Sequence, residues 1–180
     1  VSVNVSPVSF RSEEVVEVIR TELAANGLQP SDLRVEITER VMMDQNPTSL
    51  TTARAIEALG VRLAMDDFGT GYSSLSALAQ LPIAELKIDR SFMLALEEDT
   101  SAQALATAVV RIGHSLGMTV VAEGVETEAQ LELLGKLKCH AAQGFLFTAP
   151  INADDFAQWV RARARVPAVS QHEIAGQTAS

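Results

Sequence analysis

The sequence predicts an α/β protein whose parallel sheet forms an incomplete (β/α)8 barrel. Short strand-like runs alternate with helix-like runs along 180 residues, which is typical of βα units. About six such units can be recognised, whereas a complete barrel has eight and needs about 250 residues. An open doubly wound sheet is the alternative, but no glycine-rich phosphate-binding turn follows the first strand. We therefore expect a barrel with about six of its eight strands present.

Each expected strand is followed by a helix, and five of these six helices are expected to begin at a capping residue. The strands are expected at 3–5, 33–38, from 61 to the pair Asp66-Asp67, and at 85–89, 119–125 and 141–147. The expected caps are Ser12, Asn46, Thr100, Thr127 and Asn152. A short helix is also expected over 74–80.

Two of these caps have the spacing of a capping box, in which residues three apart bond each other's backbone. The pairs are Thr100 with Gln103 and Thr127 with Gln130. In the long helix after Thr100, four apolar side chains predict the face that packs on the sheet. They are Leu105, Val109, Ile112 and Leu116.

Composition narrows the class of protein. The formal net charge of −9 argues against nucleic-acid polymers as partners, and the single cysteine, Cys139, excludes a disulfide framework. A reducing, cytoplasmic setting is therefore expected. No apolar run reaches membrane-spanning length, so we expect no membrane contact from this segment. Residues 1–165 are expected to form one domain, followed by a flexible tail over 166–180.

Polar side chains gather at the carboxyl ends of the predicted strands. They are Asn4, Glu36, Asp66, Asp67, Lys87, Glu123 and Gln143. In a barrel these strand ends meet on one face, which is where catalytic groups lie. Because a buried carboxylate is costly unless it is paired or bound to a metal, this pattern indicates a site rather than solvated surface.

The adjacent carboxylates of Asp66 and Asp67 repel each other by about 4 kcal/mol at an effective dielectric near 20. Neighbouring residues of a strand point to opposite faces, so we expect the two to share a site only at a strand end. A divalent cation bound by both would explain the pair. The alternative is that Asp66 pairs with a lysine and Asp67 caps the next helix.

The expected ligands are carboxylates and one amide, all hard oxygen donors. Such donors favour Mg²⁺ or Mn²⁺, with Ca²⁺ as an alternative, over Zn²⁺ or Cu²⁺. Four carboxylates and one amide are enough for two ions, and a two-metal site suits in-line phosphoryl displacement. Lys87 would orient or help deprotonate the attacking water, or neutralise a phosphate.

Two further glutamates, Glu39 and Glu126, follow Glu36 and Glu123 by three residues. Glu39 is expected to accept a hydrogen bond from a loop hydroxyl such as that of Ser73 and so to hold the loop at 69–71. Glu126 is expected to lie at the start of its helix.

Six motifs follow one another in a specific order. They are Asn4-Val5-Ser6, Glu36-Ile37-Thr38-Glu39, the run 66–75, Leu86-Lys87-Ile88-Asp89, Ala122-Glu123-Gly124-Val125-Glu126 and Gln143-Gly144-Phe145. This order resembles that of EAL domains, the cyclic di-GMP phosphodiesterases of bacterial signalling, over about residues 1–150. The resemblance implies a TIM-like barrel of the EAL type that hydrolyses cyclic di-GMP to linear pGpG with Mg²⁺ or Mn²⁺.

The resemblance also implies roles for individual residues. The ligands of one metal match Asn4, Glu36 and Asp66, and those of the second match Asp66, Asp67 and Glu123. Lys87 matches the lysine beside the nucleophilic water and Gln143 the glutamine near it, so the expected catalytic groups are Lys87, Glu123 and Gln143. Glu39 with Ser73 resembles the pair that fixes the loop after the two aspartates, and Asp89 and Glu126 are expected to support the ligands from outside.

The sequence departs from the family pattern because the namesake Glu-Ala-Leu segment and the first two barrel strands are absent. We therefore expect a fragment of a longer protein with sensory or GGDEF domains, which forms a homodimer. A catalytically impaired cyclic di-GMP receptor or regulatory module is the alternative. A metal-dependent barrel enzyme that acts through enolates is a third possibility, outside the family.

Overall fold

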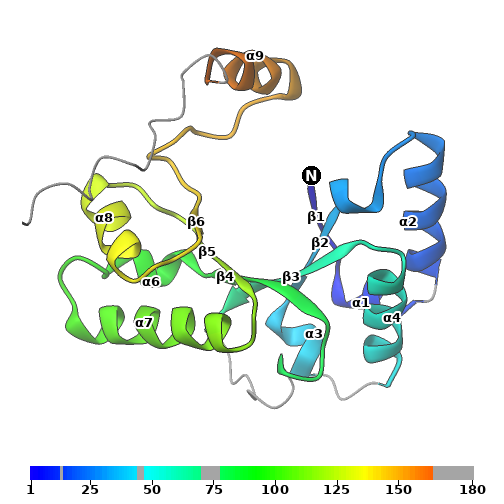
Figure 1. Ribbon diagram of the computed structural model, residues 1–180, viewed down its shortest axis with the longest axis horizontal. Helices are drawn as coiled ribbons and strands as arrows, with labels where there is room; N and C mark the ends of the chain where they lie inside the picture. The colour runs from blue at the N-terminus through cyan, green and yellow to red at the C-terminus, as the bar shows by residue number, and fades with distance from the viewer. Residues whose placement is uncertain (13, 44–46, 70–77, 164–180) are drawn as a thin grey trace, which may run out of the picture. The chain divides into compact units, whose positions relative to one another are not determined.

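The computed structural model describes residues 1–12, 14–43, 47–69 and 78–163. Strands and helices alternate along the chain (Figure 1). The strands are β1 (Ser2–Asn4), β2 (Arg34–Thr38), β3 (Arg62–Phe68), β4 (Ile83–Ile88), β5 (Thr119–Ala122) and β6 (Ala141–Ala142). The helices are α1 (Pro7–Phe10), α2 (Glu14–Ala25), η1 (Pro30–Asp32), α3 (Glu39–Met43), α4 (Pro47–Ala58), α6 (Arg90–Leu94), α7 (Thr100–Ser115), α8 (Glu128–Lys136) and α9 (Ala153–Arg163).

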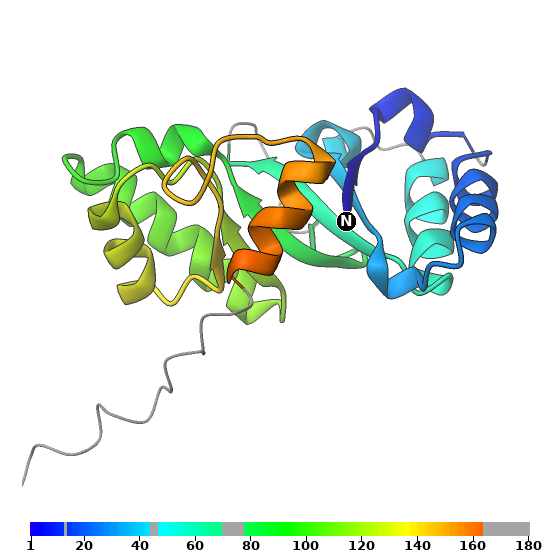
Figure 2. The ribbon, with the colours of Figure 1, turned by 90° about the horizontal axis from the view of Figure 1, so that it is seen from above.

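The six strands form one parallel sheet in the order β1-β2-β3-β4-β5-β6. Each strand therefore pairs with the next strand along the chain, as successive βα units require. The sheet is curled and open, with β1 and β6 at its edges (Figure 2). This arrangement confirms the predicted α/β class and the incomplete barrel of six strands.

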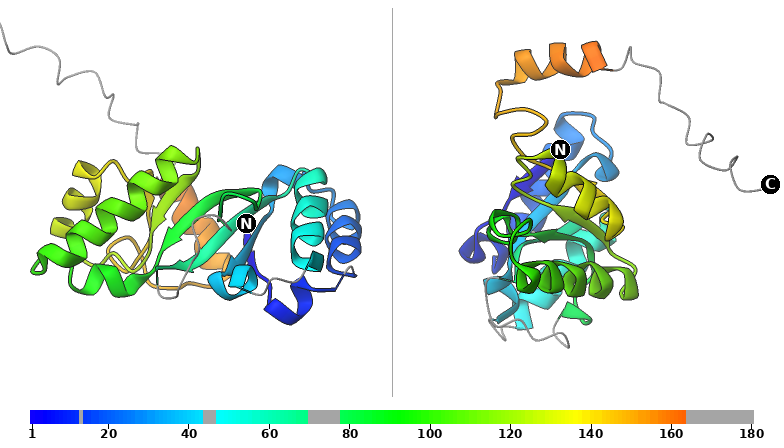
Figure 3. Two further views of the ribbon diagram at one scale, coloured as in Figure 1. Left: turned by 90° about the horizontal axis from the view of Figure 1, so that it is seen from below. Right: turned by 90° about the vertical axis from the view of Figure 1, so that its left-hand side faces the viewer.

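Helices cover the sheet in two groups, which lie toward its two ends (Figure 3). In one group α2 lies beside α4, and α4 packs on β3. In the other, α7 packs on β4 and β5 and against α6. The core between strands and helices includes Ile37, Leu63, Met65 and Leu86, each fully buried. Burial of these apolar side chains is the main favourable contribution to the folding free energy.

The buried face of the long helix α7 overlaps the predicted one only in part, since Val109 is buried and Ile112 is partly buried against the core. Leu105 and Leu116 are 56% and 41% exposed, whereas its buried residues are Ala102, Ala106, Val109, Val110 and Gly113. A Cβ atom at Gly113 would lie 2.3 Å from Cγ2 of Val120 in β5. Small residues thus let the helix approach the sheet closely, and the sequence analysis weighted large apolar residues instead.

One predicted capping box is confirmed and the other is wrong. Thr127 accepts a hydrogen bond from the N–H of Gln130, and the Gln130 side chain accepts one from the N–H of Thr127. Helix α7, however, is capped by Asp99, whose carboxylate accepts from the N–H of Ser101. Two good capping residues are adjacent here, and the chain uses the earlier one. The Ser12 cap is also present, because its hydroxyl accepts from the N–H of Glu14.

Strands β3, β5 and β6 differ from prediction at their carboxyl ends, and β5 ends at Ala122 rather than at residue 125. β3 continues through Phe68, and its register against β4 shifts between Met65 and Phe68. Asp67 has a φ of 56°, in the left-handed region. A bulge, rather than a strand end, therefore breaks the pleat at the aspartates. β6 is only two residues long, shorter than the expected 141–147. The predicted Asn46 cap and most of the helix at 74–80 lie outside the described residues.

Contacts divide the chain into two compact units, Val1–Phe147 and Thr148–Ser180. In the second unit, the predicted cap of α9 is present, because the side-chain oxygen of Asn152 accepts from the N–H of Asp155 at 2.9 Å. Phe156 and Trp159 stack on this helix with their ring centroids 6.1 Å apart. The expected tail at 166–180 lies outside the described residues. Among the helices that the structure describes, none is long and apolar enough to cross a membrane.

Candidate functional site

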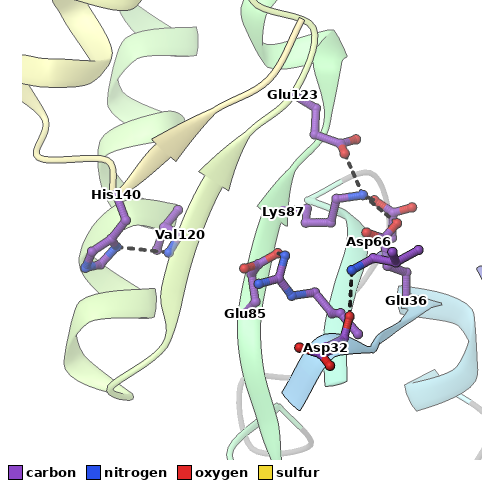
Figure 4. A network of polar contacts seen from close by, with 10 residues as sticks. Asp32, Glu36, Asp66, Glu85, Lys87, Val120, Glu123 and His140 are labelled. Carbon is purple, nitrogen blue, oxygen red and sulfur yellow. Dashed lines mark hydrogen bonds and ion pairs between the residues drawn. The ribbon is translucent and has the colours of Figure 1, made fainter. Parts of the chain in front are cut away.

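Lys87 of β4 lies at the centre of a cluster of acids from three other strands or strand ends (Figure 4). Its Nζ atom is 2.7 Å from Oε2 of Glu36 in β2 and 3.0 Å from Oδ1 of Asp66 in β3. It is 2.6 Å from Oε1 of Glu123, which directly follows β5. These contacts are possible because parallel strands bring their carboxyl ends to one edge of the sheet. Four of the residues predicted from the sequence therefore meet at one point.

The cluster is largely shielded from water, so the electrostatic interactions between its charges are stronger than they would be in solution. The side chains of Lys87 and Glu36 are 7% and 8% exposed. Burial alone would lower the pKa of Lys87, but its close contacts with the carboxylates of Glu123, Glu36 and Asp66 raise it above its ordinary value. Burial also raises the pKa of Glu123, against the opposing effect of Lys87. Three carboxylates around one ammonium leave an excess of negative charge at the site.

Asp67 lies beside this cluster, at the bulge of β3. Burial raises the pKa of its carboxyl, and the neighbouring carboxylates of Asp66 and Asp89 raise it further. Asp89 itself caps α6, because its carboxylate accepts from the N–H of Ser91 at 2.9 Å. Although burial opposes ionisation, the hydrogen bonds to Ser91 hold the pKa of Asp89 below its usual value. Asp89 thus fixes the turn that follows Lys87.

Glu39 reaches the start of the loop after β3. Its Oε2 atom accepts a hydrogen bond from the N–H of Gly69 at 3.2 Å. Gly69 has a φ of 99°, and a Cβ atom there would lie 2.6 Å from the ring of Phe92. The predicted second partner of Glu39, Ser73, lies outside the described residues.

Three other predicted residues lie near the strand ends without joining the cluster. Asn4 is the neighbour of Glu36 in the β1–β2 ladder and is exposed. Gln143 is exposed, and its backbone N–H donates to Ala122. Within the described ranges, neither side chain has a hydrogen bond to the Lys87 cluster. Glu126 is exposed, and its N–H donates to the side chain of Gln130 at 2.8 Å.

The donor set suits a hard divalent cation. Among the described residues, no three His, Cys, Asp or Glu side chains already form a ligand group, since the Lys87 ammonium lies between the acids. Oδ1 of Asp66 is nevertheless buried, and despite its ion pair with Lys87 it has no hydrogen bond with acceptable geometry. Carboxylate oxygens with spare acceptor capacity and excess negative charge are what Mg²⁺ and Mn²⁺ prefer. The residues present therefore fit such an ion.

A second ion pair, which was not predicted from the sequence, lies in the same part of the sheet. Nη1 of Arg34 in β2 is 3.1 Å from Oε1 of Glu85 in β4. Burial raises the pKa of Glu85. The positive charges of Arg34 and Lys87 lower this pKa, whereas the carboxylate of Glu36 raises it. The available signal was periodicity, because Arg34 and Glu85 each precede a predicted site residue by two positions in a strand.

The site does not include the thiol of Cys139 or the neighbouring rings of His114 and His140. Sγ of Cys139 donates to the carbonyl oxygens of Val120 and Ala141 at 3.4 and 3.3 Å. His140 accepts from the N–H of Val120 through Nδ1 at 3.0 Å, and its ring meets that of His114 edge to face. These contacts are structural.

We expect iodoacetamide to alkylate Cys139 in the folded chain more slowly at neutral pH than it alkylates free cysteine. Burial raises the pKa of this thiol, and the thiolate is the reactive form. Mass spectrometry of the modified chain between pH 7 and pH 9 measures the rate, and the urea-unfolded chain is the control. Equal rates in the folded and unfolded chain would contradict the expectation.

The sequence profile of the EAL domain family matches residues 1–150. The chain belongs to the EAL domain family. The bifunctional diguanylate cyclase/cyclic di-GMP phosphodiesterase MucR of Pseudomonas aeruginosa is 44% identical to this EAL chain over 154 residues, which are 86% of the chain and 22% of MucR. The chain therefore spans about a fifth of the length of this relative.

Solved EAL structures share the fold. The phosphodiesterase MucR in complex with c-di-GMP superposes with a TM-score of 0.83 at 43% identity, covering 86% of this chain and 63% of that one. Klebsiella pneumoniae BlrP1 in a manganese/cy-diGMP complex superposes with a TM-score of 0.77 at 34% identity, covering 83% of this chain and 38% of that one. BlrP1 also forms a calcium/cy-diGMP complex. Divalent cations thus accompany the dinucleotide in an EAL structure similar to this one.

Proposed function

We propose that this EAL chain carries the catalytic groups of a phosphodiesterase that hydrolyses cyclic di-GMP to linear pGpG with Mg²⁺ or Mn²⁺. The observation that carries the proposal is the convergence of Glu36, Asp66 and Glu123 on Lys87 at the carboxyl ends of the strands. The phosphodiesterase activity named for MucR supports the same reaction class.

The proposed metal ligands are the oxygen donors that border this cluster. They are Asn4, Glu36, Asp66, Asp67 and Glu123. Two bound ions would supply positive charge that stabilises the attacking and the leaving oxygen of an in-line displacement. The excess of carboxylates over ammonium at the site supports this assignment.

The other side chains position water and substrate. Lys87 is proposed to donate hydrogen bonds to the attacking water or to a phosphate oxygen, with Gln143 beside the same water. Hydrolysis forms one bond from water oxygen to phosphorus and breaks one phosphodiester bond, which opens the ring. Glu39 and Ser73 are proposed to hold the loop after the aspartates, while Asp89 and Glu126 support Lys87 and Glu123 from neighbouring turns.

The test is hydrolysis of cyclic di-GMP with Mn²⁺, measured as pGpG by chromatography. It is run on this chain and on the complete gene product that contains it. We expect Glu123→Gln to lower kcat by about two orders of magnitude, because it removes a charged group from the reacting centre. Glu132→Gln is the matched control, since Glu132 pairs with Lys136 at the surface.

Two outcomes would contradict the proposal. Normal turnover by Glu123→Gln in the complete gene product would show that Glu123 takes no part in the reaction. Binding of cyclic di-GMP without turnover by the unsubstituted complete product would instead identify a receptor.

A further inference from the structure

Two ion pairs join β2 to β4, one above the other. Arg34 and Glu36 are two residues apart in β2, and so are Glu85 and Lys87 in β4. Because side chains alternate between faces, each strand presents both of its charged residues on the same face. Arg34 pairs with Glu85 at 3.1 Å, and Glu36 pairs with Lys87 at 2.7 Å. Figure 4 shows Glu85 further back along β4 from Lys87.

Both pairs pass over β3, which lies between β2 and β4. The β3 residue between them is Ala64, whose neighbours in the two ladders are Glu36 and Glu85. Ala64 is fully buried, and its side chain is a single methyl group. The small side chain leaves room for the charged groups to meet across the strand.

Glu85 is placed to compete for the Lys87 ammonium. The two residues share one face of β4, and residues two apart in a strand are separated by about 7 Å. That separation is within reach of the long lysine side chain. Glu85 is 4% exposed, so water solvates and screens its charge only weakly. An unpaired Glu85 would therefore draw Lys87 away from the strand end.

The ion pair between Arg34 and Glu85 removes that competition, but it is accompanied by an unfavourable contribution to stability. Nε of Arg34 is buried and has no hydrogen-bond partner among the described residues. A buried donor without a partner is unfavourable, so stability alone does not account for the arginine. Its clear effect is to neutralise Glu85 and leave Lys87 to Glu36, Asp66 and Glu123.

We propose that Arg34 is a positioning residue that keeps the Lys87 ammonium directed at the acid cluster by occupying Glu85. The inference deepens the proposed function and rests on it for the catalytic consequence alone. It predicts that Arg34→Gln misplaces Lys87, and that a second substitution, Glu85→Gln, restores it by removing the competitor. A merely structural ion pair predicts a loss of stability that Glu85→Gln also relieves by removing the unpaired buried charge, but it predicts no change in the position of the Lys87 ammonium in the folded chain.

The side-chain ammonium signal of Lys87 in ¹⁵N NMR provides the test. The chain has three lysines, and the other two, Lys136 and Lys138, are exposed, so their ammonium protons exchange rapidly with water. We expect a protected Lys87 signal in the unsubstituted chain and in Glu85→Gln. In Arg34→Gln we expect its water exchange to be at least about tenfold faster, and in the double variant we expect the protected signal to return.

Controls separate this role from general damage. Arg20→Gln removes an arginine from an exposed ion pair with Glu17 and should leave the Lys87 signal unchanged. Arg34→Lys keeps the positive charge and should retain the signal. If Arg34→Gln does not fold in buffer, the same comparison is made in sucrose, which favours the folded chain, and an unchanged Lys87 signal there overturns the proposal.

An unchanged Lys87 signal in Arg34→Gln would overturn the proposal, and so would a double variant no better than Arg34→Gln. In the hydrolysis assay, we expect Arg34→Gln to lower kcat more than it raises KM. The NMR result does not depend on turnover. The expected signals in a complete gene product that does not hydrolyse cyclic di-GMP would therefore refute the proposed function and leave the positioning role standing.

Discussion

Lys87→Met is expected to abolish hydrolysis of cyclic di-GMP and to destabilise the chain in the presence of a chelator. Methionine nearly matches the length of lysine but leaves Glu36, Asp66 and Glu123 together without their ammonium. Removing one partner of a buried ion pair costs about 3–5 kcal/mol. The exposed fraction of Glu123, 20%, places the expected loss at the lower end of that range, about 3 kcal/mol.

Thermal unfolding followed by circular dichroism, with chelator and with Mn²⁺, measures this effect. We expect Mn²⁺ to restore part of the stability of Lys87→Met, because the ion supplies the missing positive charge. The control is Lys136→Met, whose pair with Glu132 is 66% and 70% exposed, because a pair at the surface contributes little to stability. A Lys87→Met chain that unfolds at the unsubstituted temperature in chelator would show that Lys87 does not stabilise the acids.

Gly144→Ala is expected to lower the free energy of unfolding by about 3 kcal/mol, the upper end of ordinary overpacking. A Cβ atom at Gly144 would lie 2.1 Å from the carbonyl oxygen and 2.3 Å from the nitrogen of Val125. Val125 is fully buried, and its backbone exchanges hydrogen bonds with Gln143 and Leu146. The backbone cannot move aside without breaking these bonds, so the clash separates the segment after β5 from the segment after β6.

Urea unfolding of the two chains measures the difference. Gly135→Ala is the matched control, because no heavy atom lies within 4 Å of a Cβ placed there. Gly135 lies in α8, and alanine there should raise stability by about 0.5–1 kcal/mol. If Gly144→Ala unfolds at the same urea concentration as the unsubstituted chain, the close approach to Val125 is not rigid.

Sequence patterns predicted both the strands and the residues at their ends, because the alternating runs show where a strand lies and where it ends. Alternating runs gave Glu36, Asp66, Lys87 and Glu123 as strand-end groups, and parallel pairing brings such groups to one edge. The partners of Lys87 could not be predicted individually. They depend on the curl of the sheet, which brings Glu36 of β2 and Glu123, just after β5, to one lysine of β4.

The differences arise where tertiary packing overrides local preference. The buried face of α7 is set by how closely Gly113 approaches Val120, and residue size in the helix alone does not show this. The bulge in β3 depends on an aspartate in a left-handed conformation, which has no clear signature in the sequence. The Arg34–Glu85 pair depends on the gap above Ala64, a property of three strands together.

The agreement between sheet order and sequence order has a consequence for how the chain folds during synthesis. Because each strand pairs with the strand made just before it, we expect the ladder to grow in one direction with short loop closures between neighbours. Glu36 and Asp66 precede Lys87, whereas Glu123 is made several seconds later. The nascent sheet thus carries its lysine with two of three acids, and arrival of β5 completes the charge balance.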